Sequence, residues 1–306
     1  MKQNKKRIDI IGFPMDLGAD RRGVDMGSSA LRIAGIGNKL SKLGYNVVDL
    51  GDVHIRNQER QVVEHTKLKY LQEIVKTSEL LATKVENSLD NGHFPLCLGG
   101  DHSMAIGSIA GVAAHCKKNN KTLGVIWIDA HSDMNTDETT PSGNIHGMPV
   151  AASLGLGNNA LTHIKGFAPK VKPENVALLG IRSIDVKERE TILKINLPVY
   201  TMTDIDRKGV SVIINKILND LIKRVDHIHV SFDLDAVDPD IAPGVGTPVP
   251  GGLSYRETHL IMETIAECGC MSSLEIAETN PILDYRNRSA KFAAELVASS
   301  MGKRIL

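Results

Sequence analysis

The chain has 306 residues, of which 42% are hydrophobic and 24% are charged, so it can bury a sizeable core beneath a polar surface. Its 36 Lys and Arg balance 36 Asp and Glu, and the zero formal net charge gives no electrostatic case for binding nucleic acid or an anionic membrane. No apolar run is long enough to span a bilayer, and the 4 cysteines show neither zinc spacing nor a dense disulfide framework, which favours a reduced, cytoplasmic setting.

Short apolar runs alternate with longer amphipathic stretches along the chain, which predicts alternating strands and helices. The predicted strands are 7–13, 45–50, 94–100, 122–130, 175–181, 197–202, 227–235 and 270–276. The predicted helices are 29–43, 67–91, 103–118, 210–226, 254–267 and 287–301, and Ser254 with Glu257 has the form of a capping box. This order predicts an α/β fold with a mainly parallel sheet and helices on both faces, as one three-layer domain over residues 1–306.

Three short segments, GGDHS, IDAHSD and SFDLD, follow or close predicted strands. Their metal-ligand side chains are His102, Asp129, His131, Asp133, Asp233 and Asp235. The three in IDAHSD stand at positions i, i+2 and i+4, so an extended strand would project them from one face. Open parallel sheets bind ligands at the carboxyl ends of their strands. We therefore expect these side chains to converge there.

The charge of these side chains predicts two cations. Four carboxylates buried together could not all ionise alone, because neighbouring like charges raise one another's pKa. Two divalent ions would cancel them, and a bridging carboxylate lends one oxygen to each ion. Oxygen-rich ligation with some imidazole suits manganese better than zinc or copper. A single Asp or His more often caps a helix or faces water, but that alternative does not explain three such segments in one domain.

The same segments carry a family resemblance. GGDHS, IDAHSD and SFDLDAVDPDIAPGVGTP resemble the signature segments of the ureohydrolase family, the arginases and agmatinases, and the similarity runs from IGFPMDLGADRRGVDMGSSALR to LEIAETNP. SGNIHGMP at 142–149 and GIRSID at 180–185 resemble the arginase branch of that family. The resemblance implies an arginase-like domain that hydrolyses L-arginine to L-ornithine and urea with two Mn²⁺ per chain. It also implies a homo-oligomer, either a trimer or a hexamer.

The resemblance divides the ligands between the two ions. One set comprises His102, Asp129, Asp133 and Asp233. The other comprises Asp129, His131, Asp233 and Asp235, so that Asp129 and Asp233 would bridge. A water between the ions would lose a proton near neutral pH and attack the guanidinium carbon.

Three residues receive catalytic roles by the same resemblance. Glu278 pairs with the substrate guanidinium, Asp133 carries a proton to the leaving amine, and His146 shuttles protons between the site and solvent. Without the family context, Glu278 would be taken for a solvated loop residue, and His146 for an ordinary residue of a Gly-containing loop.

Substrate length is expected to be recognised by the loop 133–147, which is rich in Asn, Ser and Thr, a composition typical of turns and of carboxylate-binding sites. By resemblance Asn135, Ser142 and Thr140 bind the α-carboxylate. Asp185 binds the α-amino group, and Glu188 assists from the same helix start.

Three other functions compete with this interpretation. An agmatinase or another guanidino or formimino hydrolase of the same family would differ in not requiring an α-carboxylate. A deacetylase of related architecture would use one zinc, which six ligands disfavour. A non-catalytic binding protein is disfavoured because every expected ligand is retained, together with His146 and Glu278.

Overall fold

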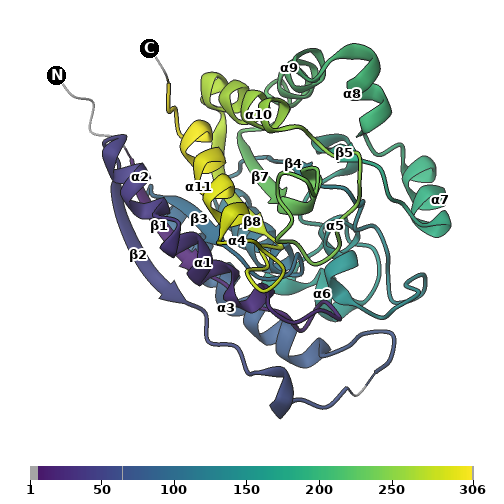
Figure 1. Cartoon of the computed structure of the whole chain (residues 1–306). Coiled ribbons are helices and arrows are strands. Elements are labelled where there is room, and N and C mark those ends of the chain that lie inside the picture. The colour runs from purple at the N-terminus through teal and green to yellow at the C-terminus, as the bar shows by residue number, and fades with distance from the viewer. Residues whose placement is uncertain (1–5, 64, 305–306) are drawn as a thin grey trace.

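The computed structural model describes residues 6–63 and 65–304, and its centre is an eight-stranded sheet (Figure 1). The strands are β1 Arg7–Gly12, β2 Asn46–Asp52, β3 Phe94–Leu98, β4 Leu123–Ile128, β5 Val176–Ile181, β6 Val199–Thr201, β7 His227–Asp233 and β8 Met271–Ala277. Their order is β2-β1-β3-β8-β7-β4-β5-β6, and every pairing in this sheet is parallel. The eight predicted strands and the predicted fold class are therefore confirmed.

Helices cover both faces of the sheet (Figure 1). One layer contains α1 Gly27–Ile33, α2 Ile36–Lys42, α8 Met202–Lys208, α9 Val210–Leu221, α10 Tyr255–Cys268 and α11 Arg288–Ser300. The opposite layer contains α3 Leu71–Asp90, α4 Met104–Lys118, α5 Pro149–Ser153, α6 Asn159–Thr162 and α7 Val186–Ile195. Each layer closes its own hydrophobic core against the sheet.

Strand β4 shows how the two cores arise from one apolar run. Successive side chains of a strand point to opposite faces. Ile126 and Ile128 belong to the core under α8–α11, while Val125 and Trp127 belong to the core under α3 and α4. A strand buried on both faces needs apolar residues at every position, which is why its sequence shows no alternation.

Helix prediction was less complete than strand prediction. The predicted helix 29–43 is divided into α1 and α2 by Gly35, whose φ of 80° no right-handed helix accommodates. The short helices α5, α6 and α8 were not predicted, and of α7 only the start near Asp185 and Glu188 was expected. Few positions of α7 are apolar and buried, since it buries only Glu188 and Ile192. The predicted capping box at the start of α10 is present, with Ser254 and Glu257 each accepting from the other's backbone N–H.

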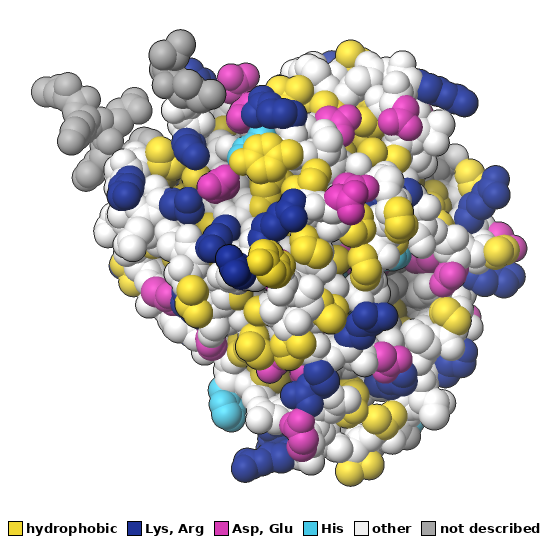
Figure 2. Space-filling view, in the orientation of Figure 1, with side chains coloured by type: hydrophobic (Ala, Val, Ile, Leu, Met, Phe, Trp, Pro, Cys, Tyr) yellow, Lys and Arg dark blue, Asp and Glu magenta, His cyan; other side chains and the backbone are white. Residues whose placement is uncertain are grey.

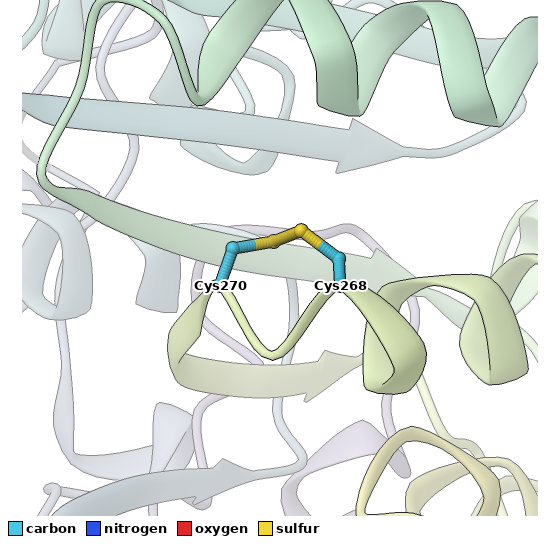
Figure 3. Close-up of a disulfide and its surroundings, with 2 residues drawn as sticks. All are labelled: Cys268 and Cys270. Atoms are coloured by element: carbon cyan, nitrogen blue, oxygen red, sulfur yellow. A yellow bond between two sulfur atoms is a disulfide. The ribbon is translucent and has the colours of Figure 1, made fainter.

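The amino ends of the strands hold an unexpected disulfide. Cys268 ends α10 and Cys270 precedes β8, and the two are bonded across one residue (Figure 3). Cys97 and Cys116 are buried free thiols. This pairing differs from the reduced state that the sequence favoured, an expectation that rested on the absence of a dense disulfide framework.

The exposed surface mixes charges of both signs. On the face shown in Figure 2, the side chains of Lys and Arg lie interspersed with those of Asp and Glu. Among the described residues, none of the helices combines the length and apolar character needed to cross a bilayer.

Candidate metal centre and active site

The predicted ligands meet at the carboxyl ends of neighbouring strands. In the sheet order, β3, β8, β7 and β4 lie side by side. His102 follows β3, Glu278 follows β8, Asp233 ends β7 and Asp129 follows β4. Since parallel strands end at one edge, four segments that are far apart in sequence deliver these side chains to one place.

The local geometry differs from the predicted one. Strand β4 ends at Ile128, so IDAHSD is not an extended strand with three side chains on one face. Asp133 has a φ of 48°, in the left-handed region, and Asp235 lies in a short 3-10 helix, Leu234–Ala236. The side chains converge because the chain turns sharply after each strand, not because of strand periodicity.

Two glycines allow the turn that places His102. Gly99 and Gly100 have φ values of 64° and 107°, which residues with a Cβ rarely adopt. A Cβ on Gly99 would lie 2.3 Å from the Ser28 backbone nitrogen, and one on Gly100 would lie 2.2 Å from the Phe13 carbonyl oxygen. The close backbone contacts leave space for glycine alone at both positions.

His102 is the centre of one potential ligand group. Its Nδ1 lies 3.1 Å from Asp129 Oδ2, 3.0 Å from Asp233 Oδ2 and 3.5 Å from Asp133 Oδ2. All four side chains are buried, and His102, Asp129 and Asp133 can offer ligand atoms within 4.8 Å of one another. This arrangement is a potential metal site.

His131 belongs to a second group that shares Asp129. Its Nδ1 lies 3.1 Å from Asp235 Oδ2 and 3.5 Å from Asp129 Oδ1. Asp129 thus turns one oxygen toward His102 and the other toward His131, as a carboxylate that bridges two ions must. Thr247 Oγ1 donates to Asp235 Oδ2 (2.9 Å) and holds that carboxylate in place.

The chemistry of the donors fits a cation. His102 Nδ1 is buried, makes no hydrogen bond with the described residues and faces three carboxylates. Burial and the neighbouring carboxylates raise the pKa of Asp133 and that of Asp233 well above the ordinary value. A divalent ion would remove this repulsion, so the residues present suit metal binding.

A buried carboxylate and an imidazole lie next to this group. Glu278 Oε1 accepts from the His102 backbone N–H (2.9 Å) and lies 3.0 Å from His146 Nδ1. Glu278 Oε2 is buried and makes no hydrogen bond within the described part of the chain. Burial lowers the pKa of His146, but the facing Glu278 carboxylate outweighs this, and the pKa is raised. His146 can therefore carry a proton near neutral pH.

The backbone is strained at two of these residues. Asp133 and Glu278 have φ values of 48° and 59°, a region that non-glycine residues visit rarely. Such conformations cost roughly 1–3 kcal/mol and tend to occur at functional sites. Here they aim two buried carboxylates at the same centre.

A cavity of about 160 Å³ opens onto the ligands. Its lining includes the predicted metal ligands His102, His131, Asp133 and Asp233. It also includes all of the predicted substrate-binding residues, Asn135, Thr140, Ser142, Asp185 and Glu188. The structure thus brings both residue sets to one cavity, although the lining residues are separated in the sequence by up to 131 positions, from His102 to Asp233.

The polar residues of the cavity also support one another. Asn135 Nδ2 donates to Asp185 Oδ2 (3.0 Å), which ties the loop to the start of α7. Glu188 Oε1 accepts from Ser132 Oγ (2.7 Å) and from the Met134 backbone N–H (2.9 Å), and its Oε2 accepts from the Asp185 backbone N–H (2.8 Å). Glu188 is buried and already satisfied, so it is better suited to hold the loop than to bind a ligand directly.

Sequence reasoning missed several residues of this site. Trp127 stacks on the His102 ring with centroids 3.9 Å apart and donates from Nε1 to Asp129 Oδ2 (2.9 Å). Thr247 in GVGTP holds Asp235. Asp101 is buried beside Glu278 and accepts from the Gly18 backbone N–H (2.7 Å). The signal for Trp127 was its position two residues before Asp129, whereas Asp101 and Thr247 lie inside the motifs GGDHS and SFDLDAVDPDIAPGVGTP, in which only the metal ligands were singled out.

Comparisons with known proteins agree with this geometry. The model of the Arginase family matches residues 6–302. The arginase of Bacillus subtilis (strain 168) is 52% identical over 301 residues, which cover 98% of this chain and 99% of that protein. The native structure of the arginase from Bacillus caldovelox has a TM-score of 0.95 at 50% identity and covers 99% of this chain and 100% of its own.

More distant relatives share the fold. The Entamoeba histolytica arginase, solved in complex with L-ornithine, has a TM-score of 0.90 at 32% identity, covering 98% of this chain and 100% of its own. Full-length similarity at this level, together with the family model that matches residues 6–302, identifies the family. The chain therefore belongs to the arginase family of hydrolases.

Proposed function

We propose that the protein is a manganese-dependent arginase that hydrolyses L-arginine to L-ornithine and urea. The observation that carries this proposal is the sharing of Asp129 between two His/Asp groups at the floor of a cavity whose walls carry amide, hydroxyl and carboxylate side chains. Its named relatives, including the Bacillus subtilis arginase, support the same reaction.

Two Mn²⁺ ions are the proposed cofactor. His102, Asp129, Asp133 and Asp233 would hold one ion, and Asp129, His131, Asp233 and Asp235 would hold the other. Bound there, the ions would offset the carboxylate charge and lower the pKa of water, so that hydroxide is available near neutral pH. Manganese is favoured because the donors are mainly oxygen.

Glu278 is proposed to bind the guanidinium group. Its Oε1 is engaged by the His102 backbone and by His146, whereas Oε2 is buried without a partner among the described residues. A buried carboxylate oxygen left unpaired is costly, and a guanidinium N–H would satisfy it. This contact would hold the guanidinium carbon over the metal ligands, and such placement lowers the barrier for attack on a poor electrophile.

Two residues are proposed to move protons. Asp133 lines the cavity among the metal ligands, where its carboxylate could take a proton from the attacking water and deliver it to the leaving amine. His146 bonds Glu278 with one ring nitrogen, and its side chain keeps 20% of its exposure, so it reaches both the site and solvent. It would shuttle protons between them.

The walls of the cavity are proposed to recognise the α-amino acid end of the substrate. Asn135, Thr140 and Ser142 would donate to the α-carboxylate, and Asp185 would accept from the α-amino group. Glu188 would assist by holding Asp185 and the loop, as its three hydrogen bonds support. Unpaired polar groups of this kind can discriminate against a substrate lacking the carboxylate by roughly 10⁴-fold.

Other attributes remain part of the proposal. Residues 1–306 would act as one catalytic domain, because strands from both halves of the chain interleave in one sheet. We expect a cytoplasmic location and a trimer or hexamer of identical chains. L-arginine is the expected partner, and we expect neither nucleic acid nor membrane to be one.

Urea release from L-arginine and from agmatine, each with and without Mn²⁺, tests the proposal. We expect manganese-dependent release from L-arginine and very little from agmatine, which lacks the α-carboxylate. Asn135→Ala should slow the arginine reaction and leave the agmatine rate nearly unchanged, since only arginine can use that contact. Comparable efficiency on both compounds would support an agmatinase instead. Inactivity on both with two manganese ions bound would indicate a different guanidino or formimino substrate, and one bound zinc would favour a deacetylase.

A further inference from the structure

A chain of buried polar side chains extends behind His102, away from the cavity. His229 and Ser231 lie on β7, and Ser273 and Glu275 lie opposite them on β8. All four are at most 1% exposed. The other faces of these strand segments carry apolar residues such as Val230 and Leu274 in the core beneath α8–α11. Burying polar side chains between a sheet and its covering helix is costly, so the presence of this row suggests that it has a function.

The row is connected to His102 by hydrogen bonds. His102 Nε2 lies 2.8 Å from Ser231 Oγ, and Ser231 Oγ donates to Glu275 Oε1 (2.6 Å). Ser108 on α4 donates to the other oxygen of Glu275, and His229 Nε2 lies 3.3 Å from Oε1. Burial alone would raise the pKa of Glu275, but His229 and the hydrogen bond from Ser108 lower it below its usual value.

The direction of these hydrogen bonds fixes the state of the His102 ring. An ionised carboxylate only accepts, so the single Ser231 hydroxyl hydrogen must point to Glu275. Ser231 Oγ can then only accept from His102, which places a hydrogen on Nε2. In the neutral imidazole the lone pair is left on Nδ1, the nitrogen that faces Asp129 and Asp233.

We propose that Glu275 is a positioning residue that acts through Ser231 to present the Nδ1 lone pair of His102 to a metal ion. The inference rests on the proposed metal centre and adds to it a group that lies outside the cavity and touches neither substrate nor ligand. A carboxylate behind a ligating imidazole holds the ring orientation and raises ligand basicity, and losing such support typically weakens metal affinity about 10- to 100-fold.

Replacement of Glu275 by Gln can reverse the direction of the hydrogen bonds through Ser231 without a large change in side-chain volume. The amide NH₂ of Gln can donate to Ser231 Oγ, and the hydroxyl hydrogen is then free to point at His102 Nε2. This favours hydrogen on Nδ1, which blocks the ligating lone pair. Ser231→Ala removes the connection itself, whereas Ser231→Thr keeps the hydroxyl.

The chain supplies its own reporter for this test. Trp127 is the 1 tryptophan of the sequence, and its ring stacks on His102 at 3.9 Å. Manganese is paramagnetic and quenches a nearby indole, so the emission of metal-stripped protein titrated with Mn²⁺ reports occupancy at His102. Calorimetric titration of the same samples gives the number of ions and their affinities.

We expect Glu275→Gln and Ser231→Ala each to weaken Mn²⁺ binding at the quenching site about 10- to 100-fold. Ser231→Thr should bind like the wild type. Ser78→Ala is the matched control, because Ser78 on α3 is equally buried but has no hydrogen bond to this row. The double variant Glu275→Gln with Ser231→Ala should bind no more weakly than Ser231→Ala alone, since Glu275 acts only through Ser231.

Two results would overturn the inference: unchanged affinity in folded Glu275→Gln, or additive losses in the double variant. Thermal unfolding in chelator establishes which variants are folded. If Glu275→Gln does not fold, the Ser231 variants decide, and equal affinity of Ser231→Ala and Ser231→Thr overturns the proposal. A wild-type chain that binds no Mn²⁺ would instead overturn the proposed metal centre, and the inference with it.

Discussion

The two edges of the parallel sheet use the same residue types under opposite conditions. At the carboxyl edge, Asp133 and Asp233 are buried among other carboxylates, which raises the pKa of each. At the amino edge, Asp90 pairs with Lys118 (2.7 Å) and with His115 (2.6 Å), which lowers the pKa of its carboxyl. The carboxyl edge holds carboxylates whose charge a bound cation can balance. At the amino edge, the carboxylate is balanced by cationic side chains of the same protein.

Left-handed backbone conformations occur at both edges, because Asn120 and Asn196, which precede β4 and β6, each have a φ of 52°. Left-handed conformations at Asp133 and Glu278 occur where strands β4 and β8 end. At the start of β8, the chain turns through Gly269, for which a positive φ costs little, and Cys268 bonds Cys270 there (Figure 3). Unpaired carboxylate charge, and not backbone strain, therefore distinguishes the site from an ordinary set of loops, although both edges contain Asp and His.

The largest expected effect comes from breaking the bridge at the carboxyl edge. Asp129→Asn should empty or disorder at least one metal site and lower kcat by about 10³-fold or more, since loss of a supporting contact alone costs about 10- to 100-fold. Metal content by elemental analysis and urea release measure both effects. Asp226→Asn makes the same change at the amino edge, where Asp226 accepts from the Thr122 backbone N–H, and should leave both unchanged. Two tightly bound ions at near-normal rates in Asp129→Asn would contradict the shared site.

A smaller effect is expected from His146→Asn. The variant should lower kcat by about 10²-fold with little change in metal content, because a proton shuttle holds no ion. Small basic buffers should restore part of the rate. His227→Asn is the control at the amino edge, since His227 lies at the other end of β7 from Asp233. Loss of metal from His146→Asn would place this imidazole among the ligands instead.

A histidine at the amino edge should lower the stability of the folded protein in acid. Burial and the nearby Lys121 lower the pKa of His227 to about 4, below its ordinary value of 6.5. Above pH 6.5 the residue is neutral in both states and contributes nothing. As the pH falls from 6.5 to 4, the unfolded chain takes up a proton that the folded chain refuses, so folding is destabilised. Allowing for partial exposure, we expect about 1 kcal/mol.

Thermal unfolding of metal-stripped protein between pH 7 and pH 4 measures this loss of folding stability. His227→Asn should lose less stability than the wild type over that window and should match its slope above pH 6.5. Parallel curves for the two proteins across the whole range would show that His227 does not titrate differently on folding.

The smallest effect is expected from the disulfide. Cys268 and Cys270 enclose a loop of only one intervening residue, and the stabilisation from a cross-link grows with loop length, so its loss should cost at most about 2 kcal/mol. The bond lies at the edge opposite the cavity. Cys268→Ser with Cys270→Ser should therefore keep the kcat/KM of the wild type, with a slightly lower Tm. A marked loss of activity would mean that the two edges are coupled through β8.

The sequence by itself determined the strands and the chemical types at the site. Apolar runs such as 123–128 are too short for buried helices and too uniform for exposed strands, so the parallel sheet could be predicted. Asp and His at strand ends predicted metal ligation from residue chemistry alone. Glu278, His146 and the substrate-binding residues came only from family resemblance, since no local pattern marks them.

Tertiary structure decided which of these groups meet and in what state. Strand order placed β8 between β3 and β7, and so brought Glu278 to His146 from 132 positions away. The sharp turns at Asp133 and Glu278 replaced the strand periodicity that sequence reasoning had assumed. The link from Glu275 to His102 depends on the register of β7 with β8. Long-range packing sets these contacts, and only contacts in a buried, low-dielectric setting shift pKa values and orient hydrogen bonds, so they cannot be predicted from neighbouring residues in the chain.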